Sequence, residues 1–520
     1  MASSRRATLT VANVLDQADA AWKAGEYEGV LRLLNGARFD RREDRVHSAI
    51  VQARAALALD RPEAVAPVLE RASKEAKSAE ETVLAKMLLG AAMTRTNRRD
   101  QGEAMLDDAA ALAQRSAHQH AAEIAYYRGL SRWSTHRLAE AEEIVEAALA
   151  TATDVPRSRL LQLLGWIDVR RENYAAAAHE FTAALGELDK SKSTDVKGRA
   201  RILIAIGIIA AETIDLRLGR VARREYDSTK WSDDTRIERF QVLEYLAWLS
   251  LLEGDVARAW DECQYALTLT IDTTYHASAL IRAAHVAGIV GDRFSEGRYL
   301  ELAGALLLRG DQVGLDVDRR NAMLSYVAAS NVNPEIARKV FALYERTRPR
   351  RTEMLALEGD RRAEAYELLA RGRASIAEGQ VQKGVAELNE SLELWTRLNF
   401  RLRAALTANV LRGITGDRKY AQIALDALRN TPKAWIREAI ERRTVDDDPL
   451  GQLTPAERRV LAELCKGKKA REIAAGFDRS FNTINNHTRA IFSAFGVRSR
   501  ASLVAECARL GILDEIKSLR

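Results

Sequence analysis

The sequence predicts an all-α protein, and three observations support this class. Glycine and proline, which interrupt helices, occur only 29 and 8 times in 520 residues. Apolar residues return at spacings of three and four along almost the whole chain, as expected of helices with one buried face. In addition, a pattern of small and bulky residues recurs about every 36 to 39 residues. No segment has the alternation of a strand.

The recurring pattern covers about residues 12–440. Its clearest copies, offset by 36 residues, are Gly129, Ala141, Val145 and Ala148, and Gly165, Ala177, Phe181 and Ala184. Gly90, Leu106 and Ala109 fit the same template 39 residues before the first copy. A small residue in one helix, followed in the next by a small and then a bulky residue, resembles the tetratricopeptide repeat. The resemblance implies an α-solenoid of helical hairpins over residues 1–441; an all-α domain without true repeats is the alternative.

A break in the helical pattern separates this region from the C-terminus. Residues 442–452 read Arg-Arg-Thr-Val-Asp-Asp-Asp-Pro-Leu-Gly-Gln, and three acids followed by proline and glycine are typical of a linker. A chain of 520 residues is also too long for one hydrophobic core. We therefore expect a repeat domain, a linker at 442–452 and a second domain at 453–520.

The positive charge of the chain lies entirely in this second domain. Residues 451–520 contain 13 Lys or Arg and 7 Asp or Glu, whereas the first 450 residues contain 66 of each sign. A small basic module beside a neutral scaffold is typical of a protein that contacts the phosphate backbone of nucleic acid, although solubility alone also accounts for six charges.

Several classes of protein are disfavoured. No apolar stretch follows Arg5 and Arg6, and the longest uncharged apolar run, residues 202–211, is too short to span a membrane. We therefore expect a cytoplasmic protein without a membrane partner. Cys263, Cys465 and Cys507 lie far apart, which predicts neither a disulfide framework nor a metal site.

Enzymatic chemistry is not indicated either. The sequence has no phosphate-binding loop of the form Gly-x-x-x-x-Gly-Lys-Ser/Thr, and no nucleophile with a base, carboxylate pair or metal cluster emerges from its acids and eight histidines. We expect no catalytic residues, no metal and no cofactor. The aromatic residues of the repeats are interpreted as core.

The second domain begins with strong helix signals. Thr454 can cap a helix that starts at Pro455, and Glu457 completes a capping box; the helix ends at Gly467. A short second helix follows over 470–476. Ser480 caps a third that runs to Phe495.

The third helix has two different faces. Its apolar face is predicted to consist of Ile484, Thr488, Ile491, Phe492 and Phe495, since residues three and four apart share a face. The opposite face carries Asn485, Asn486, Arg489 and Ser493. Asparagine can pair with adenine and arginine with guanine, so Asn485, Asn486 and Arg489 are the candidates for reading bases in a major groove.

These residues resemble the LuxR-type helix-turn-helix family from Leu453 to about Leu513. The matching motifs are Leu-Thr-Pro-x-Glu at 453–457, Gly467, Glu472-Ile473-Ala474, Ser480-x-x-Thr483-Ile484-x-x-His487 and Phe495-Gly496-Val497-Arg498-x-Arg500. The resemblance implies a four-helix domain whose third helix enters the major groove of double-stranded DNA. It also implies that the second helix braces against the backbone and that a last helix, 499–510, pairs in a homodimer.

The predicted phosphate contacts lie around the second and third helices. They are Lys468, Lys469, Arg471, Thr483, Arg498 and Arg500. For the lysines, the alternative is that they belong to a solvated loop without a binding role.

His487 is interpreted as a packing residue. Lys469, the pair Asp478-Arg479, Phe481 and Asn485 depart from the family pattern, which leaves the operator sequence open.

The sequence therefore predicts a bacterial transcriptional regulator that is not an enzyme. RNA polymerase is a further expected partner, and an unidentified peptide, protein or small molecule is the effector expected at the repeats. The alternative function is a scaffold or adaptor whose terminal domain no longer binds specific DNA.

Overall fold

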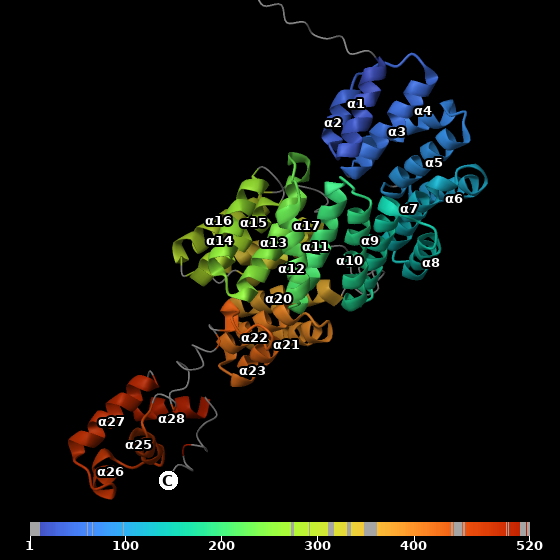
Figure 1. Cartoon of the computed structure of the whole chain (residues 1–520). Coiled ribbons are helices and arrows are strands. Elements are labelled where there is room, and N and C mark those ends of the chain that lie inside the picture. The colour runs from blue at the N-terminus through green and yellow to red at the C-terminus, as the bar shows by residue number, and fades with distance from the viewer. Residues whose placement is uncertain are drawn as a thin grey trace, which may run out of the picture. The chain divides into compact units, whose positions relative to one another are not determined.

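The computed structural model describes most of the chain (Figure 1). Within the described residues, all regular secondary structure is helical. Those residues are 11–59, 61–64, 66–96, 98–271, 275–290, 292–309, 317–329, 334–347, 361–437, 440, 450, 453–495, 497, 499–509 and 516. The all-α class is confirmed.

The N-terminal helices follow one another in short-looped pairs. They are α1 (Val11–Ala24), α2 (Tyr27–Leu34), α3 (Arg42–Ala58), α4 (Ala66–Glu75), α5 (Ala79–Thr94), α6 (Arg99–Ser116), α7 (Ala121–Ser134), α8 (Leu138–Leu149), α9 (Asp154–Arg170), α10 (Tyr174–Lys190), α11 (Val196–Thr213) and α12 (Leu216–Ser228). The 3-10 helices η1 (Pro62–Ala64), η2 (His118–His120) and η3 (Asp233–Thr235) lie between some of them.

The series continues toward the C-terminus and ends in a separate group of helices. The further repeat helices are α13 (Arg236–Glu253), α14 (Val256–Thr270), α15 (His276–Val290), α16 (Arg293–Leu308), α17 (Val317–Ala329), α18 (Pro334–Thr347), α20 (Arg361–Ala377), α21 (Val381–Arg397), α22 (Arg401–Thr415) and α23 (Arg418–Ala427). The last group is α25 (Pro455–Cys465), α26 (Ala470–Gly476), α27 (Phe481–Ala494) and α28 (Arg500–Arg509).

Glycines allow the two helices of a hairpin to approach closely. A Cβ added at Gly102 in α6 would lie 2.7 Å from the backbone oxygen of Gly90 in α5. A Cβ at Gly165 in α9 would lie 2.9 Å from Cζ of Phe181 in α10. Phe181 itself is fully buried. The small-then-bulky template read from the sequence thus describes real helix contacts, and the tetratricopeptide-like hairpin is confirmed.

The same template also occurs in α20 and α21. A Cβ at Gly372 would lie 2.8 Å from Cγ of Leu388 and 2.9 Å from the backbone oxygen of Gly384. The spacings from Gly372 to Gly384 and to Leu388 equal those from Gly90 to Gly102 and to Leu106. The same hairpin template therefore recurs in α20 and α21.

The chain divides into two compact units. One comprises residues 1–250 and 257–364, and the other comprises 251–256 and 365–520. Within the second unit, α25 to α28 have a core of their own, which includes Leu461, Ile484, Ile491 and Leu503. The predicted linker, 442–452, lies outside the described residues except for Leu450, so the domain boundaries stay predictions.

Candidate nucleic-acid interface

The first helix of the C-terminal group begins as the sequence predicts. The Thr454 hydroxyl accepts from the Glu457 amide at 3.3 Å, and the Glu457 carboxylate accepts from the Thr454 amide at 2.8 Å. Hydrogen bonds from Thr454, against the opposing effect of burial, lower the pKa of Glu457. Pro455 occupies the first turn, where no amide donor is required.

His487 connects this capping box to the third helix of the group. Its Nδ1 lies 3.7 Å from Oε1 of Glu457, and both residues are half-buried. The contact fixes α27 against the start of α25. The packing role predicted for His487 thus includes a polar contact, because the same carboxylate caps one helix and contacts the other.

The second and third helices are joined by a tight turn. Asp478 has a φ of +51°, in the left-handed region that aspartate adopts more readily than most residues. Ser480 then caps α27, accepting from the Thr483 amide at 3.1 Å. The departure from the family pattern at Asp478 therefore has a structural reason.

The two faces of α27 are clearly distinguished by burial. Ile484, Ile491 and Phe495 are buried. A stripe with spacings of four, three and four is exposed: Asn482, Asn486, Arg489 and Ser493. Asn485 is half-buried and lies at the flank of this stripe. Asn482 was missed in the sequence analysis, although the helical spacing of the stripe could have indicated it.

The basic residues around α26 differ in their intramolecular contacts. Lys468 and Lys466 both pair with Glu463, the latter at 3.1 Å. The hydrogen bond from Lys468, and then that from Lys466, lower the pKa of the Glu463 carboxyl against the opposing effect of burial. Arg500 donates to the Lys468 carbonyl at 3.3 Å. The intramolecular contacts of Lys468 and Arg500 therefore stabilise the turn that follows α25.

Lys469 and Arg471 are the more available cations. Both are exposed. Lys469 stands at the N-cap of α26, where its ammonium cannot accept a hydrogen bond. Its amide donates to Glu472 at 2.7 Å, and its carbonyl accepts from the Ile473 amide at 3.0 Å. The guanidinium of Arg471 lies 5.8 Å from the ring centre of Phe481, whose side chain is 44% exposed.

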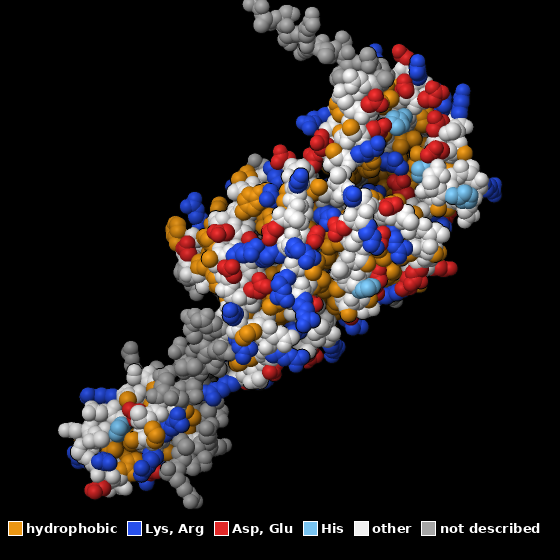
Figure 2. Space-filling model, viewed as in Figure 1, with side chains coloured by type: hydrophobic (Ala, Val, Ile, Leu, Met, Phe, Trp, Pro, Cys, Tyr) orange, Lys and Arg blue, Asp and Glu red, His pale blue; other side chains and the backbone are white. Residues whose placement is uncertain are grey.

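The two remaining residues predicted to contact phosphate are Thr483 and Arg498. The Thr483 hydroxyl lies 2.9 Å from that of Ser480, at the first turn of α27. Arg498 lies outside the described residues. On the face drawn in Figure 2, Lys and Arg side chains are more frequent than Asp and Glu on these C-terminal helices, whereas the repeats carry both signs interspersed.

Other kinds of site are not found among the described residues. None of the described helices combines the length and the hydropathy that a membrane span requires. The described His, Cys, Asp and Glu side chains form no group of three or more that could hold a metal ion.

Comparisons with known proteins bear on each part of the chain. No curated protein sequence matches it. Among solved structures, it is similar to a Rap protein complexed with competence and sporulation factor, with 15% identity, a TM-score of 0.44, and coverage of 70% of this chain and 100% of that one. It is also similar to the APC/C hetero-tetramer Cut9-Hcn1, with 15% identity, a TM-score of 0.36 and 83% coverage of both chains. Neither likeness is close enough to indicate a ligand or a partner.

The C-terminal helices give the informative match. Residues 451–506 match the model of the GerE family, described as bacterial regulatory proteins of the luxR family. The matched range contains α25, α26 and α27 and most of α28. The C-terminal domain of this chain is therefore a helix-turn-helix domain of the luxR family of bacterial regulatory proteins.

Proposed function

We propose that this chain is a sequence-specific, DNA-binding transcriptional regulator controlled by a ligand or a protein at its helical repeats. The observation that carries the proposal is the polar stripe on α27, exposed opposite a buried apolar face in a domain of a regulatory family. An exposed helix face of amide and guanidinium groups suits the donor and acceptor pattern of the major groove.

We assign base contacts to Asn485, Asn486 and Arg489, and add Asn482 because it belongs to the exposed stripe.

Lys469 and Arg471 are the residues proposed to contact phosphate most directly, since they are exposed. Lys468 and Arg500 would contact phosphate only alongside their intramolecular bonds. No catalytic activity is proposed, because the matched family is one of regulatory proteins.

The active form is proposed to be a homodimer, because one short helix reads too few base pairs for useful specificity. Residues 499–510 would contribute to its interface, and RNA polymerase would be a further partner. An operator for such a dimer has two inverted half-sites about 10 base pairs apart. Footprinting that shows a single unrepeated half-site, with a monomer in solution, would contradict this arrangement.

The experiment that tests the function is recovery of genomic DNA fragments by the purified full chain. A regulator enriches a small set of fragments over bulk DNA, and cell extract added as a source of effector changes that enrichment. Recovery in proportion to bulk DNA, with and without extract, would reject sequence-specific regulation.

A second candidate function is an adaptor that binds a protein through the repeats. Its support is the apolar Phe481 side chain, 44% exposed at the start of α27, together with the pairing of Lys466 and Lys468 with Glu463. An adaptor would show no fragment preference in the same experiment.

A further inference from the structure

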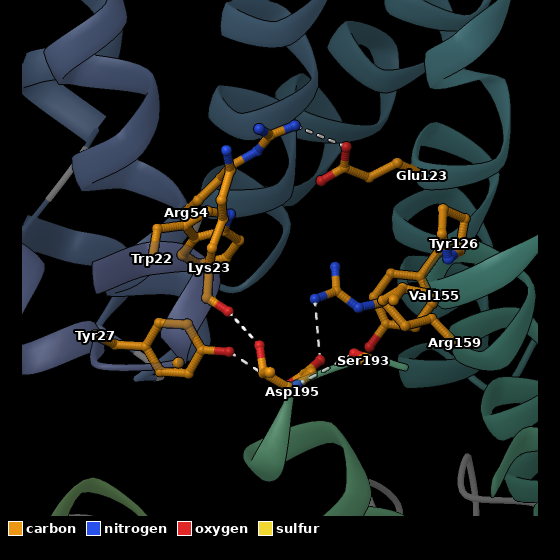
Figure 3. A pocket seen from close by; sticks show the side chains of 13 residues that line it. Trp22, Lys23, Tyr27, Arg54, Glu123, Tyr126, Val155, Arg159, Ser193 and Asp195 are labelled. Carbon is orange, nitrogen blue, oxygen red and sulfur yellow. Dashed lines mark hydrogen bonds and ion pairs between the residues drawn. The ribbon is translucent and has the colours of Figure 1, made fainter. Parts of the chain in front are cut away.

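A cavity of about 260 Å³ lies within the first compact unit (Figure 3). Its wall is built by residues of α1, α2, α3, α7 and α9 and by residues 193–195, which precede α11. Tyr27 donates to Asp195 at 3.2 Å, and the Thr194 hydroxyl donates to the Lys23 carbonyl. These contacts join the first hairpin to the start of α11 on one side of the cavity.

Asp195 is held in place by several contacts. It caps α11 by accepting from the Gly198 amide at 2.8 Å, and a Cβ at position 198 would lie 2.6 Å from its Oδ2. Burial opposes the charge of Asp195, but Arg159 and the Gly198 hydrogen bond lower its pKa overall. Burial and the neighbouring Asp195 raise the pKa of Tyr27, so its hydroxyl remains a donor.

Two arginines in the wall have N–H donors that make no hydrogen bond to the described residues. Among the described residues, Arg159 has one partner within hydrogen-bond distance, Asp195 at 3.5 Å, and a guanidinium carries five N–H donors. Figure 3 shows the Arg159 guanidinium extending toward the middle of the cavity. Arg54 donates through Nη2 to Glu123 at 2.9 Å, while its buried Nε has no partner in the described part of the chain.

The charge and size of the cavity restrict what it can hold. Arg54 and Arg159 contribute two positive charges, against two negative charges from Glu123 and Asp195, and the exposed lining residue Lys23 adds a third positive charge. A net charge of about +1 favours a monoanion over a doubly charged phosphate, which would also meet two carboxylates. A volume of 260 Å³ is below the roughly 300–1,000 Å³ of sites for drug-sized ligands. The ligand, or the part of it inside the cavity, is therefore about one residue in size.

The lining also includes aromatic side chains and the Glu123 carboxylate. Trp22 and Tyr126 line the cavity from different helices, and the Trp22 ring is held 5.1 Å from the ring of Tyr27. Aromatic faces bind apolar side chains, and the Glu123 carboxylate can accept from an ammonium or amide N–H. Guanidinium groups, in turn, match a carboxylate with two parallel hydrogen bonds.

We propose that this cavity binds the free α-carboxylate of an amino acid or of the C-terminal residue of a peptide. Arg159 is its main partner, and Trp22 and Tyr126 contact the apolar side chain of the bound residue. The proposed carboxylate site names the class of effector for the proposed function. Only the effect of this ligand on DNA binding rests on that proposed function.

Titration calorimetry on the full chain tests the proposal. The probes are the 20 free amino acids, tripeptides with each of the 20 C-terminal residues as free acids, and the same tripeptides amidated at the C-terminus. We expect saturable binding of a free acid with an apolar or aromatic terminal residue and no binding of its amide. Binding of free amino acids as well as tripeptides identifies the smaller ligand as sufficient; binding of tripeptides alone identifies a peptide terminus.

Variants locate the binding. R159Q should weaken it at least about tenfold, because a charge-assisted hydrogen bond is lost. R157Q is the matched control: Arg157 lies on the same helix outside the cavity lining and donates to the Leu149 carbonyl at 2.6 Å. It should bind as the unsubstituted chain does. Thermal unfolding checks that R159Q folds; if it does not, R54Q on the opposite wall replaces it in the same comparison.

Three results would overturn the proposal: no binding of any free acid, equal binding of acid and amide, or unchanged affinity in a folded R159Q chain. Genomic DNA recovery is measured on the same preparations without probes. Failure of the cavity proposal therefore leaves DNA binding intact, and failure of the regulator proposal leaves the calorimetric result intact.

Discussion

The side chains proposed to read DNA project from α27 to different extents. Arg489 and Asn486 are exposed, and Asn485 is half-buried. An exposed guanidinium can form two hydrogen bonds with guanine, so replacing Arg489 by alanine should cost about 1–3 kcal/mol at the preferred site and relax base preference there. Quantitative binding to single-base variants of a recovered fragment measures both effects.

Lys469 provides the control for Arg489. It is exposed at the start of α26 and is proposed to contact phosphate, so K469A should weaken binding to all sequences alike and make the salt dependence shallower. If K469A changed base preference while R489A weakened all sequences alike, the placement of α27 in the groove would be wrong.

Glu457 makes the stability of the C-terminal domain depend on acid. Its pKa in the folded chain is lowered, chiefly by hydrogen bonds from Thr454. The stabilisation is therefore complete above the unfolded pKa of about 4.3 and is lost as the pH falls through the lower folded pKa. We expect the free energy of unfolding of residues 451–520 to decrease below about pH 4.3 for this reason.

Urea unfolding of E457Q between about pH 3 and pH 7 isolates that effect, because glutamine can still complete the capping box but does not titrate. The variant should lose part of the decrease in stability at acid pH. An identical pH dependence in both proteins would show that Glu457 does not contribute to it.

At the scale of the element, two helix-interior glycines allow a matched comparison. A Cβ at Gly102 would lie 2.7 Å from backbone atoms of Gly90 and Thr94, which cannot move aside as a side chain could. A Cβ at Gly186 in α10 would meet nothing within 4 Å. G102A should therefore destabilise its hairpin by about 1–3 kcal/mol through overpacking, and G186A should stabilise by about 0.5–1 kcal/mol through backbone entropy.

The measurement is the urea midpoint followed by the helical circular dichroism signal of the full chain. The midpoint should fall for G102A and remain equal or rise for G186A. Shifts of the same sign and size in both variants would mean that helix propensity, rather than the α5 and α6 contact, determines the outcome.

At the scale of the whole molecule, the charge distribution predicts a division of labour. The excess of positive charge lies in residues 451–520, and their helices have a core of their own. This fragment should bind DNA alone, whereas residues 1–440 should not at the same salt concentration. With about 4–6 phosphates neutralised per subunit, log affinity should fall with log salt by roughly 0.9 per phosphate.

Titration of both fragments into labelled duplex DNA at several salt concentrations checks the prediction. Binding by residues 1–440 that matches the C-terminal fragment would contradict it. A salt response near zero would contradict the electrostatic part alone.

Features that depend on neighbouring residues could be predicted from the sequence. Contacts three or four residues apart determine the Thr454 and Glu457 capping box and the Ser480 cap, and the structure confirms both. On the predicted inner face of α27, Ile484, Ile491 and Phe495 are buried, and Thr488 and Phe492 are half-buried. The close approach of Gly165 to Phe181 was also readable, because a repeated hairpin fixes the spacing of its contacts.

Contacts between segments that are distant in the sequence became visible in the folded chain alone. In the sequence, Lys468 and Arg500 are simply two basic residues that could contact phosphate. In the structure they lie next to each other although they are 32 residues apart, because the Arg500 guanidinium donates to the Lys468 carbonyl. Tyr27 and Asp195, separated by 168 residues, meet at the cavity. No local pattern encodes such a meeting, because it depends on small rotations that accumulate from one hairpin to the next.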